Sequence, residues 1–253
     1  SDSILSELYF QDANGLSHYR LVHENEEFSA TGFLPGAGDQ LTWRTTGPVA
    51  TGYNASVRAG LSIRQQGFQN VRMASSVKTY ERVDGATLTG EAAPNQTVIA
   101  AVELETNADR PFLYTQSVQT DEDGTFSITV PYATNDELGP ADGYTDSAVD
   151  ATTSYSIVAG DNVSRSDYQT DGWNQNASIS LEGTTNVSES AVVDGESVQV
   201  DLGEYDGGNA SDGGNQTDDS GSDSGADGTD GSGSDGGNTT ADLEPVARPA
   251  LTA

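Results

Sequence analysis

The chain has 253 residues and a formal net charge of −30, from forty acidic and only ten basic side chains. This balance argues against nucleic acid as a partner, because duplex binding needs clustered lysine and arginine to displace counterions. Only one basic residue, Lys78, is a lysine. Self-repulsion of so many carboxylates is largely screened in molar salt, where the Debye length is about 3 Å. The composition therefore predicts a halophilic protein that loses structure in dilute buffer; an ordinary acidic secreted protein is the alternative.

The length allows one large domain or two small ones. The chain has no cysteine, so it forms no disulfide. No stretch approaches the roughly 20 apolar residues of a membrane-spanning helix. The start at Ser1 lacks both an initiator methionine and the basic start of a signal peptide. We therefore expect an internal piece of a longer protein, or a processed product.

Residues 1–76 predict a small region of mixed helix and strand. Ile4, Leu5 and Leu8 have helical spacing, whereas residues 17–23 alternate as a strand does. Later apolar runs are short and separated by turn residues. The elements expected here are a helix within 1–10 and strands within 17–23, 41–44, 57–64 and 71–75.

Residues 77–202 predict an antiparallel β-sandwich. Runs rich in Val, Ile, Thr, Phe and Tyr recur there, with turn signals between them. The sequence Thr120–Gly124 (TDEDG) is expected to form a hairpin loop. The strands expected are 77–83, 86–91, 97–105, 111–119, 125–132, 154–159, 177–181 and 197–202.

Residues 203–241 are nearly all Gly, Asp, Ser, Asn and Thr. Such a segment buries too little apolar surface to offset the entropy of ordering, which predicts a disordered acidic linker. A flexible coil of this length has an end-to-end distance of roughly 30–40 Å. The C-terminal tail, residues 242–253, recovers some apolar character.

The acceptor pattern for N-glycosylation, N-x-[ST], occurs at eight of the fourteen asparagines. This excess favours an extracytoplasmic location, although asparagine, serine and threonine also meet often in polar turns. The candidate acceptors are Asn54, Asn95, Asn162, Asn176, Asn186, Asn209, Asn215 and Asn238.

No combination of residues in the sequence identifies a chemical reaction. His18 and His23 are five apart, which on a strand places them on opposite faces and argues against a shared metal. The run Asp121–Gly124 is half of a calcium-binding loop, and a tight turn is the better interpretation. Trp43 and Trp173 could each stack on a sugar, but a lone tryptophan is more often part of a core.

Four stretches resemble the C-terminal soluble region of haloarchaeal oligosaccharyltransferases. Residues 77–90 (VKTYERVDGATLTG) are similar to the family pattern V-K-T-[FY]-E-x-V-x-G-A-x-x-x-G. Residues 114–126 (YTQSVQTDEDGTF) resemble Y-T-Q…T-D-x-x-G-x-F. Residues 18–22 (HYRLV) resemble H-[YF]-R-x-V, and a further match begins at residues 130–134 (VPYAT). Together the matches span residues 18 to about 145.

This resemblance implies the extracytoplasmic C-terminal part of an enzyme at an archaeal cell membrane. The family transfers a dolichyl-linked oligosaccharide to Asn in N-x-S/T, and the full-length enzyme is expected to use Mn or Mg. The implied partners are the membrane-embedded catalytic part, the lipid-linked oligosaccharide and the acceptor polypeptide. No nucleic acid is implied.

The family's catalytic signatures do not occur in this sequence. Its W-W-D-Y-G, D-x-x-K and acidic metal-binding motifs are missing, so no catalytic, cofactor-binding or metal-binding residue is assigned. We therefore expect a structural or acceptor-positioning role for this portion. The alternative is a halophilic cell-surface or secreted β-sandwich binding module without enzymatic activity.

Overall fold

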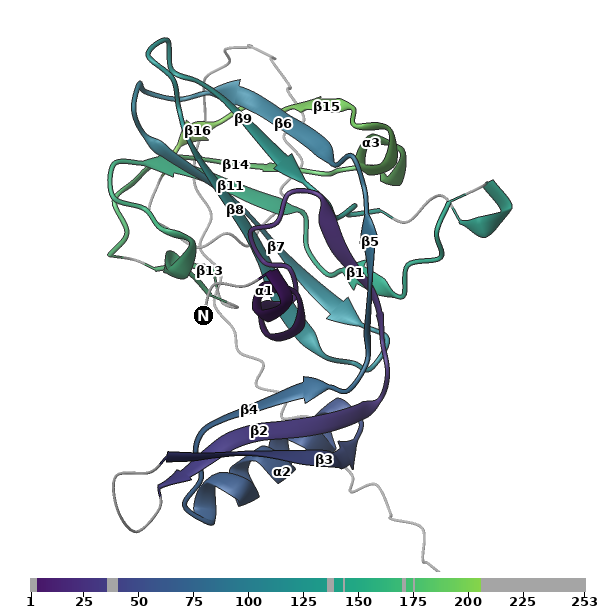
Figure 1. The fold of residues 1–253 in the computed structure, drawn as a ribbon. Helices are drawn as coiled ribbons and strands as arrows, with labels where there is room; N and C mark the ends of the chain where they lie inside the picture. Colours follow the sequence, from purple (N-terminus) through teal and green to yellow (C-terminus); the bar gives the residue numbers. More distant parts are fainter. Residues whose placement is uncertain are drawn as a thin grey trace, which may run out of the picture. The chain divides into compact units, whose positions relative to one another are not determined.

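The computed structural model describes residues 4–35, 41–135, 139–142, 144–169, 172–174 and 176–205 (Figure 1). Most described elements are strands, and they form several sheets whose pairings are antiparallel except at β15. The predicted mainly β fold with a short mixed α/β N-terminal part is confirmed. The tail over 242–253 and the predicted linker from residue 206 onward lie outside the described residues.

The N-terminal part begins with helix α1 (Ile4–Gln11), which confirms the helix predicted within residues 1–10. A tight turn follows, with Asp12 and Ala13 at φ of 54° and 59°. Strand β1 (Tyr19–Glu24) then pairs antiparallel with β5 (Lys78–Arg82), so the chain returns to β1 after more than fifty residues.

The residues between β1 and β5 form a small sheet covered by a helix. Strands β2 (Glu27–Pro35), β3 (Leu41–Thr51) and β4 (Gln69–Ser75) pair in the order β3-β2-β4. Helix α2 (Tyr53–Gln65) lies along one face of this sheet (Figure 1). Its small residues Ser56 and Gly60 face the sheet and are buried, and a Cβ on Gly60 would lie 3.0 Å from Met73 Cγ.

The strand predicted within residues 57–64 is wrong, because these residues belong to α2. Val57, Ala59, Leu61 and Ile63 alternate with more polar residues, which is the pattern of a half-buried strand. The helix instead packs through Ser56 and Gly60 and leaves Val57 and Leu61 exposed. Close packing through small residues therefore overrides the alternation.

Two sheets form the sandwich over residues 85–205. Strands β7 (Thr97–Thr106), β8 (Pro111–Gln119), β10 (Val149–Ala151), β11 (Tyr155–Gly160), β14 (Ile179–Thr185) and β16 (Gly203–Glu204) form one sheet. Strands β6 (Ala86–Glu91), β9 (Thr125–Val130) and β15 (Ser197–Gln199) form the other, in which β15 and β6 are parallel. The small strand β16 uses the first two residues of the predicted linker.

The hairpin predicted at Thr120–Gly124 is also a misassignment. Strand β8 pairs with β7, whereas β9 pairs with β6, so this turn carries the chain from one sheet to the other. The buried Thr120 turns the chain here: its Oγ1 donates to Ala93 O at 2.8 Å and accepts from Gln96 N at 2.9 Å.

The core of the sandwich lies between the inner faces of the two sheets. The smaller sheet contributes Leu88 and Ile128, and the larger sheet contributes Val102, Tyr114 and Ile157. All five side chains are at most 2% exposed. Burial of these apolar side chains, at about 1.5–3 kcal/mol each, is the main favourable contribution to folding of this part.

The remaining described elements are short. They are the 3-10 helices Pro140–Asp142 and Arg165–Asp167, strands β12 (Tyr168–Gln169) and β13 (Gly172–Trp173), and helix α3 (Glu189–Asp194). Helix α3 was not predicted, although it carries two helix signals. Ser188 accepts a hydrogen bond from Ala191 N as N-cap, and Gly195 ends the helix at φ 73°.

Candidate functional site

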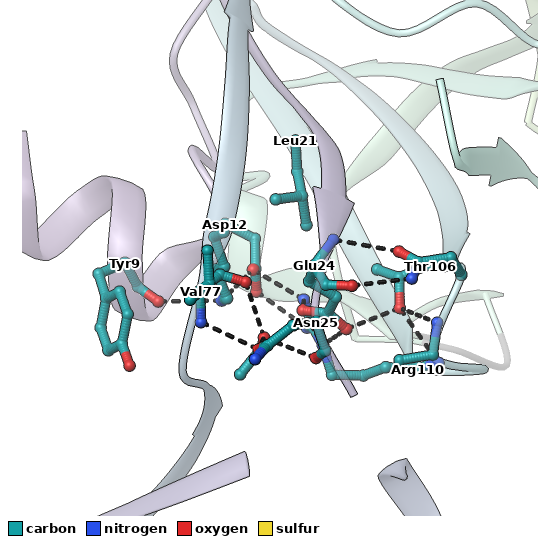
Figure 2. Close-up of polar contacts among 12 residues, drawn as sticks. Tyr9, Asp12, Leu21, Glu24, Asn25, Val77, Thr106 and Arg110 are labelled. Carbon is teal, nitrogen blue, oxygen red and sulfur yellow. Dashed lines mark hydrogen bonds and ion pairs between the residues drawn. The ribbon is translucent and has the colours of Figure 1, made fainter. Parts of the chain in front are cut away.

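The most elaborate polar arrangement in the described residues is buried where α1, β1 and β5 meet the sandwich. We call its first half the Arg110 cluster, made of Asp12, Glu24, Lys78 and Arg110 (Figure 2). Arg110 lies in the turn between β7 and β8. Its Nε and Nη2 donate to the Glu24 carboxylate at 2.9–3.2 Å, and Nη1 and Nη2 donate to Asp12 at 3.0 and 2.9 Å.

Glu24 is fully buried at the end of β1, and further donors satisfy it. Thr106 Oγ1 donates to Glu24 Oε1 at 2.7 Å. Asn107 brackets the Glu24 backbone, because its side chain donates to Glu24 O at 2.8 Å and accepts from Glu24 N at 3.1 Å. Every side-chain partner of Glu24 named here lies between residues 106 and 110, so this carboxylate fixes β1 to the β7–β8 turn.

Lys78, the sole lysine, fixes the end of α1. Its side chain is 4% exposed, and Nζ donates to Asp12 Oδ1 at 2.5 Å and to Tyr9 O at 2.9 Å. The Tyr80 hydroxyl, two residues further along β5, donates to Leu8 O. These bonds satisfy two carbonyls at the C-terminus of α1, where helices leave such groups without partners.

The second half, the Arg20 cluster, consists of Arg20, Glu81 and Glu189. The Arg20 guanidinium is 2% exposed and donates to both oxygens of Glu189, at 2.9 and 2.6 Å. It also donates to Glu81 Oε2 at 2.9 and 2.6 Å. Glu189 is 4% exposed and begins α3, whereas Glu81 is 26% exposed on β5. The cluster therefore joins β1 and β5 to the sandwich.

Both arginines stay charged in this setting. Burial by itself would lower the pKa of Arg20 and of Arg110, but their hydrogen bonds and opposite charges outweigh it and raise both values. For Arg20 the carboxylates of Glu189 and Glu81 have this effect, and for Arg110 those of Glu24 and Asp12. Paired and saturated in this way, the two clusters are suited to holding segments together rather than to proton transfer.

The residues singled out as candidate ligands do not converge in the structure. His18 is exposed beside Asp84 O, and His23 is exposed on β1. The described residues contain no group of three or more His, Asp or Glu side chains placed to hold a metal ion. None of the helices in the described ranges is long and apolar enough to cross a membrane.

The acidic turn and the tryptophan have structural contacts. Asp121 accepts from Thr125 Oγ1 and from the amides of Thr125 and Asp123 at 2.6–3.0 Å, and these bonds, led by that of the Thr125 side chain, lower its pKa. Trp173 packs edge-on against Tyr168 at 4.8 Å and donates to Ser156 Oγ at 2.9 Å. The side chain of Trp43 lies outside what the structure describes.

Five candidate glycan acceptors lie in the described residues, and they differ in how the sequon is presented. Asn54, Asn95, Asn162, Asn176 and Asn186 are all exposed, whereas Asn209, Asn215 and Asn238 lie outside these ranges. In three of them the serine two residues later is engaged. Ser56 is 1% exposed in α2, Ser164 donates to Asp167 at 2.8 Å, and Ser188 caps α3.

We therefore predict that Asn95 and Asn176 are modified in the folded chain more readily than the other described sequons. Asn95 sits at the tip of a turn with φ 61°, and Ser178 of the Asn176 sequon is exposed. Peptide mass spectrometry after glycosylation of the folded chain would measure occupancy, and the unfolded chain is the control. Equal occupancy of Asn54 and Asn95 in the folded chain would contradict the prediction.

Comparison with known proteins identifies the sandwich. The family described as "Archaeal glycosylation protein B long peripheral domain" matches residues 85–198. A dolichyl-monophosphooligosaccharide–protein glycotransferase, AglB of Haloferax volcanii, is 48% identical over 86 residues, which are 32% of this chain and 8% of the relative. A dolichyl-phosphooligosaccharide-protein glycotransferase 3 of Archaeoglobus fulgidus is 27% identical over 219 residues, which are 78% of this chain and 22% of the relative.

Solved structures of the Archaeoglobus fulgidus oligosaccharyltransferase also match. The complex of that enzyme with Zn and sulfate has a TM-score of 0.48 at 20% identity, covering 78% of this chain and 24% of the other. Its complex with an inhibitory peptide and a dolichol-phosphate also has a TM-score of 0.48 at 20% identity, covering 78% of this chain and 22% of the other. The chain thus spans less than a quarter of the length of these relatives.

The resemblance drawn from residues 18–145 is confirmed by the family match over residues 85–198 and by the two glycotransferase relatives. Residues 85–198 therefore form the long peripheral domain of the archaeal AglB oligosaccharyltransferase family.

Proposed function

We propose that this chain is the extracytoplasmic C-terminal part of an archaeal oligosaccharyltransferase, an enzyme that transfers a lipid-linked glycan to Asn in N-x-S/T. Within that enzyme its role is structural: it holds the peripheral domain in a fixed orientation to the catalytic part. The observation that carries the proposal is the family match over residues 85–198, together with 48% identity to a named transferase over 86 residues.

The two charge clusters support the structural role. Both connect elements that precede residue 85 with the peripheral domain, through Glu24 and Arg110 in one and Arg20 and Glu189 in the other. Removing one partner of a buried ion pair lowers the stability of the folded protein by several kcal/mol. Such a pair therefore resists reorientation of the segments that it joins. If the elements that precede residue 85 were connected flexibly to the peripheral domain, such contacts would not be needed.

Glycan transfer assays test the proposal. The isolated chain, incubated with lipid-linked oligosaccharide, Mn²⁺ and a sequon peptide in molar salt, is expected to yield no glycopeptide. The intact enzyme under the same conditions is expected to yield it, and glycopeptide formed by the isolated chain would contradict the proposed division of labour.

The gene distinguishes this proposal from the alternative of a secreted binding module. We expect membrane-spanning segments and a W-W-D-Y-G motif to be encoded upstream of Ser1. A simple signal peptide in their place would overturn the assignment to a transferase.

A further inference from the structure

The charge of this chain is distributed very unevenly. Residues 40–80 contain five of the ten basic residues and none of the forty acidic ones. This segment covers β3, α2, β4 and the start of β5. In a chain with forty carboxylates, a segment of 41 residues that has none differs from the surface that the rest of the chain presents to solvent.

The same part of the chain exposes apolar side chains. Val57 and Leu61 on α2 are 43% and 53% exposed, and they are four residues apart on one side of the helix. Arg58 and Arg64 lie on the same exposed side of the helix and flank them. The large apolar side chains that the described residues expose are Ile4, Phe10, Val49, Val57, Leu61 and Val77, all of which precede the peripheral domain.

Two hollows with basic residues in their walls adjoin each other, and α2 lines the first of them. The first, about 250 Å³, has Val57, Leu61 and Arg64 in its wall, and no carboxylate is among the described residues that line it. The second, about 280 Å³, includes Phe10, Arg72 and Lys78, with Asp12 as its acidic residue. Met73 and Arg110 line both hollows, so the two adjoin. The Arg72 guanidinium lies 5.6 Å from the centroid of Phe10.

We propose that this face, consisting of the exposed side of α2 and the two hollows, is where the remainder of the oligosaccharyltransferase docks. This proposal rests on the proposed function above. The segment that fits carries carboxylates next to apolar side chains, because Arg64 and Arg72, which belong to neither charge cluster, line the hollows together with Val57, Leu61 and Met73. More than three quarters of each named relative lies outside the matched region, which leaves ample protein to supply such a segment.

A lipid surface fits these observations less well. In molar salt the Debye length is about 3 Å, so basic side chains attract an anionic bilayer only at contact. Two exposed aliphatic side chains on α2 offer little apolar area for insertion into a bilayer. A segment of the same enzyme is held nearby by the polypeptide, and the resulting effective concentration makes a modest contact sufficient.

Docking here also bears on Asn54. This asparagine lies seven residues, or two helical turns, before Leu61 and so shares its side of α2. A glycan at Asn54 would cover the face, and we therefore expect Asn54 to be unmodified in the assembled enzyme.

Single cysteines test the docking face, because the chain has no native cysteine. Leu61→Cys places a thiol on the face, and Ser62→Cys places one on the same helix at an exposed position that lines neither hollow. Both thiols should react with a maleimide at similar rates in the isolated chain, whose melting temperature confirms folding. In the intact enzyme the Leu61→Cys thiol should react at least about tenfold more slowly, since modification then waits for the interface to open.

The outcomes separate this inference from the proposed function. Equal rates for the two thiols, in an intact enzyme that still transfers glycan, overturn the docking face and leave the proposed function standing. If anionic vesicles alone protect the Leu61→Cys thiol of the isolated chain from the maleimide, the docking face is overturned in favour of a membrane contact. If no transferase containing this chain exists, the proposed function itself fails.

Discussion

Replacing Arg20 by leucine should lower the free energy of unfolding by about 3–5 kcal/mol, as found when one partner of a buried ion pair is removed. Leucine fills part of the space but leaves the Glu189 carboxylate, which is 4% exposed, without its cation. Denaturant unfolding of the wild-type and variant chains in molar salt would measure the difference. Because Glu189 begins α3, we expect the contact between β1 and the sandwich to be lost first.

Two further variants show whether the loss comes from the uncompensated charge. Glu81 is 26% exposed and keeps access to water, so Glu81→Gln should be less damaging than Arg20→Leu. The double variant Arg20→Leu, Glu189→Leu removes both charges and should recover most of the stability. A double variant as unstable as Arg20→Leu alone would show that packing of the arginine, rather than the pairing of charge, is what matters.

Several longer strands of the peripheral domain were predictable from sequence because their apolar residues lie in the core. The expected spans 86–91 and 111–119 agree with β6 and β8, and 97–105 differs from β7 at one end only. Period-2 alternation is a reliable signal where a strand is half buried. The partner of each strand was harder to predict, as the Thr120–Gly124 turn shows, because it depends on which sheet the chain enters after the turn.

Helix α2 was mistaken for a strand because the residues on its buried face are not the large apolar ones. Only small residues, Ser56 and Gly60, are fully buried, while the large apolar residues Val57 and Leu61 stay exposed. A helix whose apolar side chains all face its own sheet would show the 3.6-residue period that sequence analysis detects. The failure of the pattern thus coincides with the face that we assign to docking.

The charge clusters could not be predicted from one sequence. Arg20 and Glu189 are 169 residues apart, and Arg110 and Glu24 are 86 apart, so nothing local links them. Because forty carboxylates are available to ten basic side chains, the composition does not show which residues form ion pairs. The one relevant signal in the sequence was that it contains a single lysine, because the side chain of this residue, Lys78, is nearly fully buried in the Arg110 cluster.

Alkaline pH should destabilise this protein steeply, because three buried tyrosines resist ionisation. Tyr114, Tyr132 and Tyr155 are at most 2% exposed, and burial is the main cause that raises the pKa of each above its usual value. In the folded state they keep the phenolic proton after the unfolded chain, with a tyrosine pKa of about 10, has lost it. Their contribution to stability is therefore complete below about pH 10 and is lost as the pH rises further.

The magnitude follows from proton linkage. Each tyrosine that is ionised only in the unfolded chain lowers the unfolding free energy by about 1.4 kcal/mol per pH unit, so these three together contribute about 4 kcal/mol per unit above about pH 11. Tyr80, whose pKa is also raised by burial, adds to this slope. Denaturant unfolding from about pH 8 to about pH 11.5 in molar salt would measure the slope, and the part of the tyrosinate absorbance that is due to the buried tyrosines should appear only when the chain unfolds.

Tyr114→Phe gives a matched control, since its hydroxyl makes only a 3.3 Å hydrogen bond, to Leu16 O. Removing one titrating group should reduce the slope by about 1.4 kcal/mol per pH unit, while stability near neutral pH changes little. Lower tyrosinate absorbance in the folded Tyr114→Phe variant than in the folded wild type below about pH 11 would contradict this account, because it would show that Tyr114 ionises before unfolding. It would mean that water reaches the phenol of Tyr114, although this side chain belongs to the same buried cluster as Leu88, Val102 and Ile157.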